Sequence, residues 1–297
     1  MPGDLHWRSY YKRPIITIGE YRCRPSFPGR GGEETTPSHS IVFVRSGLFV
    51  KHVRGKEVVA DANQVIFFNG GEPYRVSHPV AGGDICTSFT LERNTLLDLL
   101  SGHDPAAPDR PETPFRFTHG PSEPGYFRRL QQIFHALEGA GADALALEES
   151  VLDLLAAVVR SVHRLNLGQR TPKRPATARF QRERVEAAKL FLNAHFRERL
   201  GLVQVARAVH LSPYHLCRLF KRETGAAIHQ YQNRLRLRAA LDALSDPRRD
   251  LTGLALDVGY FDLSHFSNAF RQEFGISPSE FRRRGMHFRT ARLSRTH

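Results

Sequence analysis

Apolar residues change their spacing partway along the chain. From Ile15 to about Leu91 they alternate with polar residues in short runs separated by glycine-containing turns, as in SIVFVRSGLFVKHV and VVADANQVIFFNGGEPYRV. This alternation predicts short antiparallel strands in a small barrel or sandwich. Beyond residue 125 apolar residues recur every three or four positions, which predicts helices. We therefore expect an α+β chain of two domains, an N-terminal antiparallel β-barrel with accessory helices and a C-terminal all-α domain.

Composition indicates how these parts are connected. Residues 1–14 are predicted to form a loosely attached arm, and the proline-rich residues 101–124 a long connection. Helices are expected over about 125–137 and 144–165, where they would cover the barrel or meet a second subunit. Residues 166–182 are polar, basic and contain prolines, as linkers often do. The predicted units are 1–165, the linker 166–182, a helical domain at 183–285 and a basic tail at 286–297.

Two segments of the helical domain repeat one pattern. Residues 202–225, LVQVARAVHLSPYHLCRLFKRETG, correspond to residues 251–275, LTGLALDVGYFDLSHFSNAFRQEFG. The offset is 49 residues at the paired alanines, Ala206 and Ala255, and 50 at the paired phenylalanines near the end of each segment. The second copy therefore has one extra residue in its turn. Each copy predicts a helix, a turn and a second helix that ends at a glycine.

The second helix of each copy is predicted to begin at a capping side chain, Ser212 or Asp262. In a helix-turn-helix unit this helix enters the major groove of DNA, where arginine can pair with guanine and asparagine with adenine. We expect Arg218 and Asn268 to read bases. An ordinary helical bundle with solvated polar residues is the alternative, and two copies in a basic segment argue against it. The other candidates for DNA contact are Tyr214, Cys217, Lys221, Leu263, Ser264, Ser267 and Arg271.

Charge divides between the two predicted domains. Residues 1–165 carry a net charge of −1 and residues 166–297 a net charge of +14, within a total of +13. A basic half indicates a nucleic-acid partner and binding that weakens with salt. In the long helix between the two copies, Arg234, Arg236 and Arg238 are expected to face phosphates or solvent.

No run of about twenty apolar residues predicts a membrane span. The first residues, MPGDLHWRSYYKRPIITIG, lack the apolar core of a signal peptide. The three cysteines lie far apart in the sequence and are expected to be reduced thiols. These features predict a cytoplasmic protein.

Three segments together resemble the DNA-binding domain of the AraC/XylS family of bacterial transcription regulators. They are LVQVARAVHLSPYHLCRLFKRETG, RLRLRAALDAL and LALDVGYFDLSHFSNAFRQEFGISPSEFRRR, within about residues 183–285. The resemblance implies seven helices, two reading heads joined by one long helix, and binding to double-stranded promoter DNA. It also implies a homodimer, contact of an activator with RNA polymerase, and no enzymatic activity. Cys217 and Asn268 depart from the longer polar or basic residues usual at their positions.

The N-terminal strands resemble the cupin-like sensor domain of many such regulators, through SHSIVFVRSG followed by ANQVIFFNGGEPYRV. Metal-binding cupins carry histidines in both motifs. Here only His39 remains of the first pair, and Tyr74 stands in the second motif. We therefore expect a small-molecule effector in the barrel and no required cofactor or metal-dependent catalysis. The candidate ligand-binding residues are His39, Arg45, Glu72, Tyr74 and Arg75.

Two alternatives to a small-molecule regulator stay open. The first is a metal- or redox-responsive regulator, because two thiols and two imidazoles would suit a soft metal or zinc if they converged. No two of them have the close spacing of a CxxC motif. The second is a constitutive architectural DNA-binding protein without an effector. The residues of the metal or redox alternative are Cys23, His39, His78 and Cys86.

Overall fold

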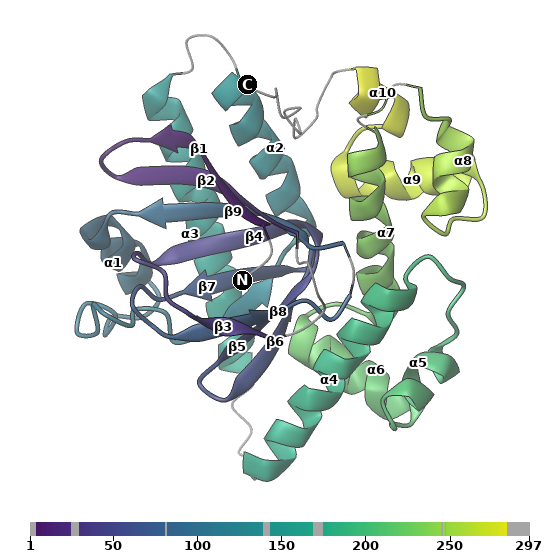
Figure 1. Cartoon of the computed structure of the whole chain (residues 1–297), viewed down its shortest axis with the longest axis horizontal. Helices are drawn as coiled ribbons and strands as arrows, with labels where there is room; N and C mark the ends of the chain where they lie inside the picture. Colours follow the sequence, from purple (N-terminus) through teal and green to yellow (C-terminus); the bar gives the residue numbers. More distant parts are fainter. Residues whose placement is uncertain are drawn as a thin grey trace.

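The computed structural model describes residues 4–24, 30–80, 82–138, 143–168, 175–244, 246 and 248–283. A strand-rich half is followed along the chain by a helical half (Figure 1). The strands are β1 (Asp4–Lys12), β2 (Ile16–Arg24), β3 (Arg30–Glu34), β4 (Ser40–Gly47), β5 (Phe49–Val53), β6 (Lys56–Ala60), β7 (Gln64–Phe68), β8 (Tyr74–Ser77), β9 (Asp84–Leu91) and β10 (His119–Pro121). The helices are α1 (Arg93–Ser101), α2 (Pro124–Glu138), α3 (Ala144–Gly168), α4 (Pro175–His195), α5 (Leu202–Ala208), α6 (Pro213–Thr224), α7 (Ile228–Leu244), α8 (Leu251–Asp257), α9 (Leu263–Phe274) and α10 (Pro278–Arg283).

Two antiparallel sheets form the N-terminal half. Among the residues that the structure describes, one has six strands in the order β1-β2-β9-β4-β7-β10, and the other has four in the order β3-β8-β5-β6. Alternate side chains of both sheets meet in one apolar cluster between them. Val42, Val44 and Ile66 come from the first sheet, and Phe49 and Val58 from the second. The predicted α+β class, with an antiparallel β domain followed by a helical domain, is confirmed.

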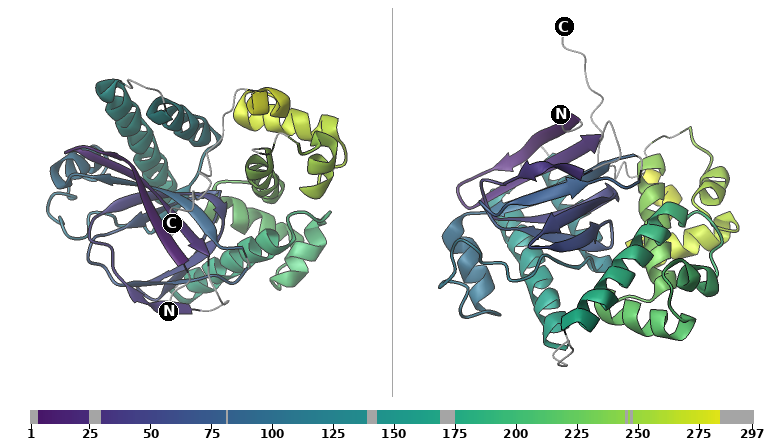
Figure 2. Two further views of the ribbon diagram at one scale, coloured as in Figure 1. Left: turned by 45° about the horizontal axis from the view of Figure 1, so that its top comes forward. Right: turned by 60° about the horizontal axis from the view of Figure 1, so that its bottom comes forward.

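Helices cover the outer faces of both sheets. Ile18 and Phe43 of the six-stranded sheet pack in one cluster with Leu154 of α3. On the four-stranded sheet, Val59 packs in a cluster with Leu190 of α4. Figure 2 shows α2 and α3 beside the strands and the C-terminal helices on another side. Among the described residues, no helix is long and apolar enough to cross a membrane.

Residues 4–12 form a strand, so the prediction of a loosely attached arm at 1–14 is wrong for them. β1 pairs antiparallel with β2, and Trp7 lies opposite Tyr21 with 4.4 Å between ring centroids. The Trp7 ring also lies over Gly19, where a Cβ would come within 1.8 Å of it. Trp7 stays 45% exposed at the sheet edge, which explains why the sequence lacks the signature of a buried strand.

Two connections are more ordered than composition predicts. The stretch 101–124 contains β10, which pairs with β7. The predicted linker 166–182 is helical at both ends, because α3 continues to Gly168 and α4 begins at Pro175. Proline suits the first turn of a helix, so Pro175 begins α4 rather than excluding a helix. Residues 169–174 and the predicted tail 286–297 lie outside the described residues.

Within the described residues, the helical half has the seven helices that the family resemblance implies, α4 to α10. It meets the sheets through a buried carboxylate, Asp61, in the turn between β6 and β7. Asp61 Oδ2 accepts hydrogen bonds from Tyr231 Oη of α7 at 2.5 Å and from Asn193 Nδ2 of α4 at 2.6 Å. Burial and the nearby Asp61 carboxylate raise the pKa of Tyr231, so its hydroxyl remains a donor.

A second contact to α7 lies about two helical turns beyond Tyr231, at Arg238. Arg238 is buried, and its guanidinium carbon lies 3.7 Å from the ring centroid of Phe127 in α2 and 5.4 Å from that of Phe274 in α9. Glu273 lies 3.7 Å from the guanidinium, and burial lowers the pKa of Arg238 to about 9. Arg236 Nε donates to the Phe196 carbonyl at 2.6 Å. The expectation that these arginines face phosphates or solvent is therefore wrong for Arg238, because aromatic rings from both halves enclose it.

Replacing Asp61 with alanine removes the acceptor that Tyr231 and Asn193 share. Because the Tyr231 hydroxyl would stay buried without its partner, we expect the free energy of unfolding to fall by about 1–3 kcal/mol. Urea unfolding of the full chain, followed by far-ultraviolet circular dichroism, measures this. Asp109→Ala, at an exposed position, should stay within about 0.5 kcal/mol of wild type. Equal effects of the two substitutions would contradict the structural role given to Asp61.

Candidate nucleic-acid interface

The first helix-turn-helix unit consists of α5 and α6 around a small apolar core. Val205 and Ala206 of α5 are buried together with Leu216, Leu219 and Phe220 of α6. These positions are three or four residues apart, so each helix presents one apolar stripe to the other. The opposite face of α6 is thereby left to polar side chains.

The predicted helix ends are confirmed in both units. Ser212 Oγ accepts a hydrogen bond from the backbone N–H three residues later at 3.3 Å, and Asp262 Oδ1 does the same at 2.7 Å. Gly225 and Gly275 end α6 and α9 with φ of 76° and 82°, in the left-handed region that favours glycine. The local sequence therefore specifies where both second helices begin and end.

The two turns differ by one residue, as the sequence predicts. Residues 209–212 join α5 to α6, whereas residues 258–262 join α8 to α9. Each turn contains one residue with positive φ, His210 at 53° and Gly259 at 92°. A Cβ on Gly259 would lie 2.4 Å from the Arg197 carbonyl oxygen. The longer turn thus needs glycine, while the shorter one accommodates a histidine.

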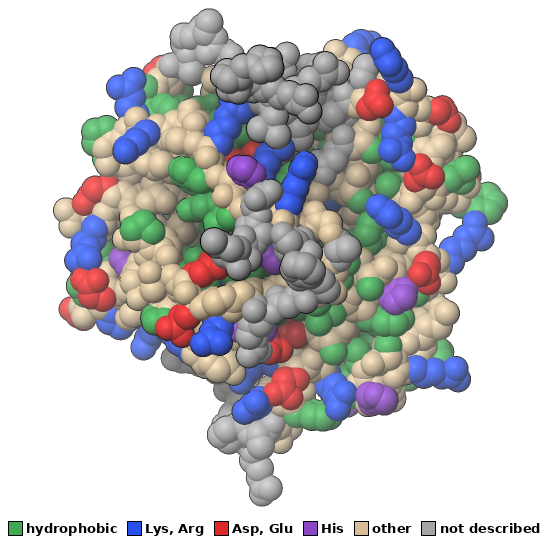
Figure 3. Space-filling model, in the orientation of Figure 1, with side chains coloured by type: hydrophobic (Ala, Val, Ile, Leu, Met, Phe, Trp, Pro, Cys, Tyr) green, Lys and Arg blue, Asp and Glu red, His purple; other side chains and the backbone are tan. Residues whose placement is uncertain are grey.

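The outward faces of α6 and α9 carry the side chains proposed for DNA contact. In α6, Tyr214 is 71% exposed, and the Arg218 guanidinium carbon lies 5.7 Å from its ring centroid. A ring beneath a guanidinium restricts its orientation, as a base-reading arginine requires. The other exposed candidates are Cys217, Lys221, Ser264, Asn268 and Arg271, and Leu263 and Ser267 are half-buried. On the face seen in Figure 3, Lys and Arg side chains are spread over the helical half rather than gathered into one patch.

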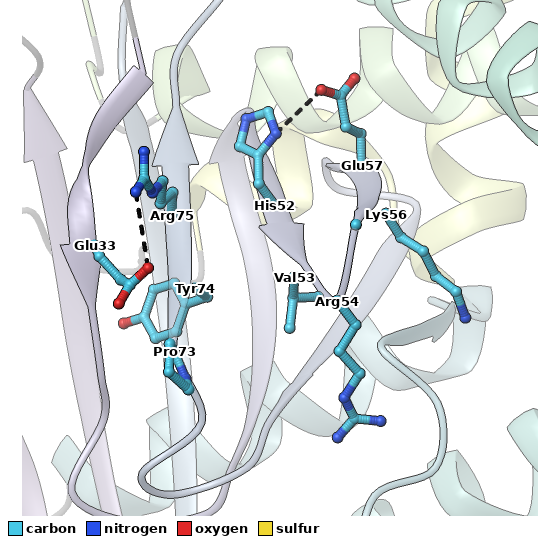
Figure 4. A pocket seen from close by; sticks show the side chains of 10 residues that line it. Glu33, His52, Val53, Arg54, Lys56, Glu57, Pro73, Tyr74 and Arg75 are labelled. Atoms are coloured by element: carbon cyan, nitrogen blue, oxygen red, sulfur yellow. Dashed lines mark ion pairs between the residues drawn. The ribbon is translucent and has the colours of Figure 1, made fainter.

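A groove of 390 Å³ lies on the four-stranded sheet (Figure 4). Tyr74 and Arg75, both predicted to bind a ligand, line it. Arg75 lies 3.8 Å from Glu33 and His52 lies 3.2 Å from Glu57, and each pair joins register neighbours on adjacent strands of this sheet. The remaining lining residues are Val53, Arg54, Gly55, Lys56 and Pro73. Its lining combines basic side chains, which would suit an anionic group, with the carboxylates of Glu33 and Glu57.

Of the other three predicted ligand residues, His39 and Arg45 lie away from the groove and Glu72 lies only at its rim, so the five do not converge. His39 Nδ1 accepts from the Gly70 N–H at 2.9 Å. Arg45 pairs with Glu20 and lies 5.2 Å from the Phe134 ring of α2, on the helix-covered side of the sheet. Glu72 pairs with Arg54 at the rim of the groove. Alternation along β4 places Arg45 with Ile41 and Phe43, away from the space between the sheets.

Sequence reasoning missed a lysine that is buried in β5. Lys51 Nζ donates to the Phe67 carbonyl at 2.6 Å and lies 3.8 Å from the Phe68 ring centroid. Burial lowers the pKa of Lys51 to about 7. The sequence feature that could have predicted this burial is a single lysine within the largely apolar run FVKHV.

The predicted cysteine and histidine cluster forms only in part. Cys23 and His78 converge, and the residue that joins them is Asp84, which the sequence analysis did not select. Cys86 is adjacent, because its thiol donates to Asp84 Oδ2 at 3.1 Å, whereas His39 lies elsewhere. Burial lowers the pKa of His78, but hydrogen bonds to Asp84 and Cys23 outweigh this and raise it to about 9. Asp84 precedes Cys86 by two positions on one strand, so their side chains lie on the same face. That spacing could have predicted Asp84 as a member of the cluster.

Comparison with known proteins agrees with the helical arrangement. Residues 205–284 match a family model described as a helix-turn-helix domain. The chain is 25% identical over 285 residues to the transcriptional activator RhaS of Klebsiella pneumoniae (strain 342), covering 94% of this chain and 96% of the relative. It is 28% identical to RhaS of Enterobacter sp. (strain 638), with coverages of 82% and 84%.

Two solved structures illustrate the structural neighbours. ToxT from Vibrio cholerae aligns over 93% of this chain and 100% of its own, at 10% identity and a TM-score of 0.35. A regulator with an AraC-type DNA-binding domain from Chromobacterium violaceum aligns over 35% of this chain and 93% of its own, at 29% identity and a TM-score of 0.33.

The turn of the second unit gives a stability prediction. Gly259→Ala would force a Cβ into the Arg197 carbonyl oxygen at positive φ, so we expect the free energy of unfolding to fall by about 2 kcal/mol or more. Gly253→Ala is the matched control, since Gly253 lies inside α8 and should tolerate alanine, with a gain of up to about 1 kcal/mol. Urea unfolding followed by circular dichroism compares them. A loss from Gly253→Ala as large as that from Gly259→Ala would contradict this account.

Lys51 gives a pH prediction. Its folded-state pKa of about 7 lies below the ordinary lysine value, so the unfolded chain binds its proton more tightly than the folded chain does. Stability is thus expected to fall as pH decreases from about 10 to 7, and Lys51→Met should remove that part of the slope. Denaturation midpoints across this range test it, with the exposed Lys12→Met as control. Parallel profiles for wild type and Lys51→Met would contradict the expectation.

Proposed function

We propose that this chain is a sequence-specific transcription activator of the AraC/XylS family that senses a small molecule, as its helix-turn-helix match and its similarity to RhaS support. The observation that carries the proposal is the pair of capped helices, α6 and α9, with polar residues on their outward faces. In helix-turn-helix proteins such a helix lies in the major groove and reads bases from its N-terminal part. The two units would occupy successive grooves of one promoter.

The proposed contacts follow from position along each helix. Arg218 would donate two hydrogen bonds to a guanine, with Tyr214 restricting its orientation. Asn268 of α9 would pair with an adenine in the next groove. Lys221 and Arg271 lie further along their helices, where they would contact phosphates and make affinity depend on salt.

The groove on the four-stranded sheet is the proposed effector site. Lys56 and Glu57 line it, and both belong to β6. Further along β6, the Val59 N–H donates to Glu186 Oε2 of α4 at 2.6 Å, and Asp61 follows directly after the strand. An anionic small molecule that moved this strand would therefore act on both α4 and α7, which is the coupling that a ligand-controlled regulator needs.

The proposed assembly is a homodimer that acts in the cytoplasm and contacts RNA polymerase at the promoter. The exposed side of α3 is the proposed dimer surface, where Leu145 is 65% exposed. An apolar side chain of that exposure is available for contact with a second subunit. Light scattering of wild type and Leu145→Glu would test this surface separately from DNA binding.

Base reading by Arg218 gives the main functional test. The preferred site is first selected from random DNA with purified full-length protein, and affinity is then measured by fluorescence anisotropy at fixed salt. Arg218→Ala should weaken binding to that site by about 1–3 kcal/mol and relax preference at one base pair. Arg116→Ala removes an exposed arginine from the strand-rich half and should leave affinity unchanged.

Two outcomes would change this view. A uniform loss across all sequences would make Arg218 a phosphate contact rather than a base reader. Sequence-independent, salt-sensitive binding by the wild-type protein would contradict the specific regulator and support the architectural alternative.

A further inference from the structure

Three side chains of different chemistry meet at one end of the sheets. Cys23 of β2 lies directly opposite Asp84 of β9, and His78 follows β8 of the other sheet. Each residue offers one ligand atom, and these atoms lie within 4.8 Å of one another. They are a thiol sulfur, an imidazole nitrogen and a carboxylate oxygen. His78 and Asp84 are buried, and Cys23 is half-buried. The group is thus largely shielded from solvent, with Cys23 as its partly exposed member.

The backbone around this group is closely packed. Gly47 pairs with Asp84 across β4 and β9, and a Cβ on Gly47 would lie 1.9 Å from the Gly83 carbonyl oxygen. Asp84 is also fixed at both carboxylate oxygens, Oδ1 lying 2.8 Å from His78 Nε2 and Oδ2 accepting from the Cys86 thiol. The donor atoms are therefore held near one another by the fold rather than by flexible side chains.

We propose that Cys23, His78 and Asp84 form a binding site for a divalent cation of the zinc class. A thiolate, an imidazole and a carboxylate are the ligands that such borderline-soft cations take, whereas magnesium and calcium prefer oxygen atoms alone. Three protein ligands leave a fourth coordination position for solvent or a small molecule. Binding would displace protons from the thiol and the imidazole. Cys86 acts as a positioning residue, because it holds the second carboxylate oxygen.

The register of the strands disfavours a disulfide at this place. Cys23 lies opposite Asp84, and Cys86 lies opposite Tyr21, so the two cysteines are diagonal neighbours. Diagonal neighbours have Cα atoms about 7–8 Å apart, beyond the usual reach of a disulfide. The alternation of β9 instead places Cys86 beside Asp84 on one face. The geometry thus favours cation binding over a disulfide between Cys23 and Cys86 at this cluster.

Cobalt(II) provides a direct test, because it replaces zinc and reports sulfur ligation by charge-transfer absorption. Reduced full-length protein, cleared of metal with a chelator, is titrated with cobalt chloride and then with zinc chloride. We expect one cobalt ion per chain, a thiolate charge-transfer band, and loss of that band when zinc is added. Cys23→Ser should abolish the band. His78→Gln should weaken affinity more than about tenfold, since even residues outside the ligand set cause losses of that size.

The third cysteine supplies the matched control. Cys217→Ser removes an exposed thiol in α6 and should leave the cobalt spectrum unchanged. Folding of Cys23→Ser is checked by circular dichroism. If that variant does not fold, Asp84→Asn, which keeps the shape of the side chain, serves as the test of the site instead. No cobalt band in wild type, or a band that persists in Cys23→Ser and Asp84→Asn, would overturn the proposal. The assay contains no DNA, so its failure would leave the proposed regulator function standing.

Discussion

The arrangement of the whole molecule depends on how the strand-rich half holds α7. Asp61 binds Tyr231 near one end of this helix, and Phe127 covers Arg238 two turns further along. Seven residues are about two helical turns, so both contacts lie on one face of α7. The same helix connects the two helix-turn-helix units. One rigid element therefore carries both the contact between halves and the spacing of the reading heads.

This arrangement gives the buried polar groups a clear role. Burying a carboxylate away from solvent costs free energy unless hydrogen-bond donors surround it. Asp61 accepts hydrogen bonds from side chains of both α4 and α7. Arg238 is likewise stable because two rings and Glu273 enclose it. Separation of the halves would leave some of these groups without partners. The contact is thus specific in geometry, since an apolar surface alone would tolerate sliding.

The helix-turn-helix units were predictable because their signals are local. Ser212, Asp262, Gly225 and Gly275 mark the helix ends through bonds within a few residues. The features that sequence reasoning missed depend on distant partners. From the sequence, Arg238 would be expected at an exposed helix position, but Phe127, more than a hundred residues earlier, and Phe274 of α9 enclose it. Convergence of the cysteine, histidine and carboxylate likewise depends on strand register across two sheets, which composition does not reveal.

The chain contains a single tryptophan, and its position has a practical consequence. Trp7 lies on β1, the edge strand of the six-stranded sheet, beside Tyr21 and over Gly19. Its fluorescence therefore reports the docking of this one strand, whereas helical ellipticity is dominated by the helices of both halves. Comparing the two optical signals during unfolding would reveal whether the sheet edge opens before the helices do, without attaching any label to the protein.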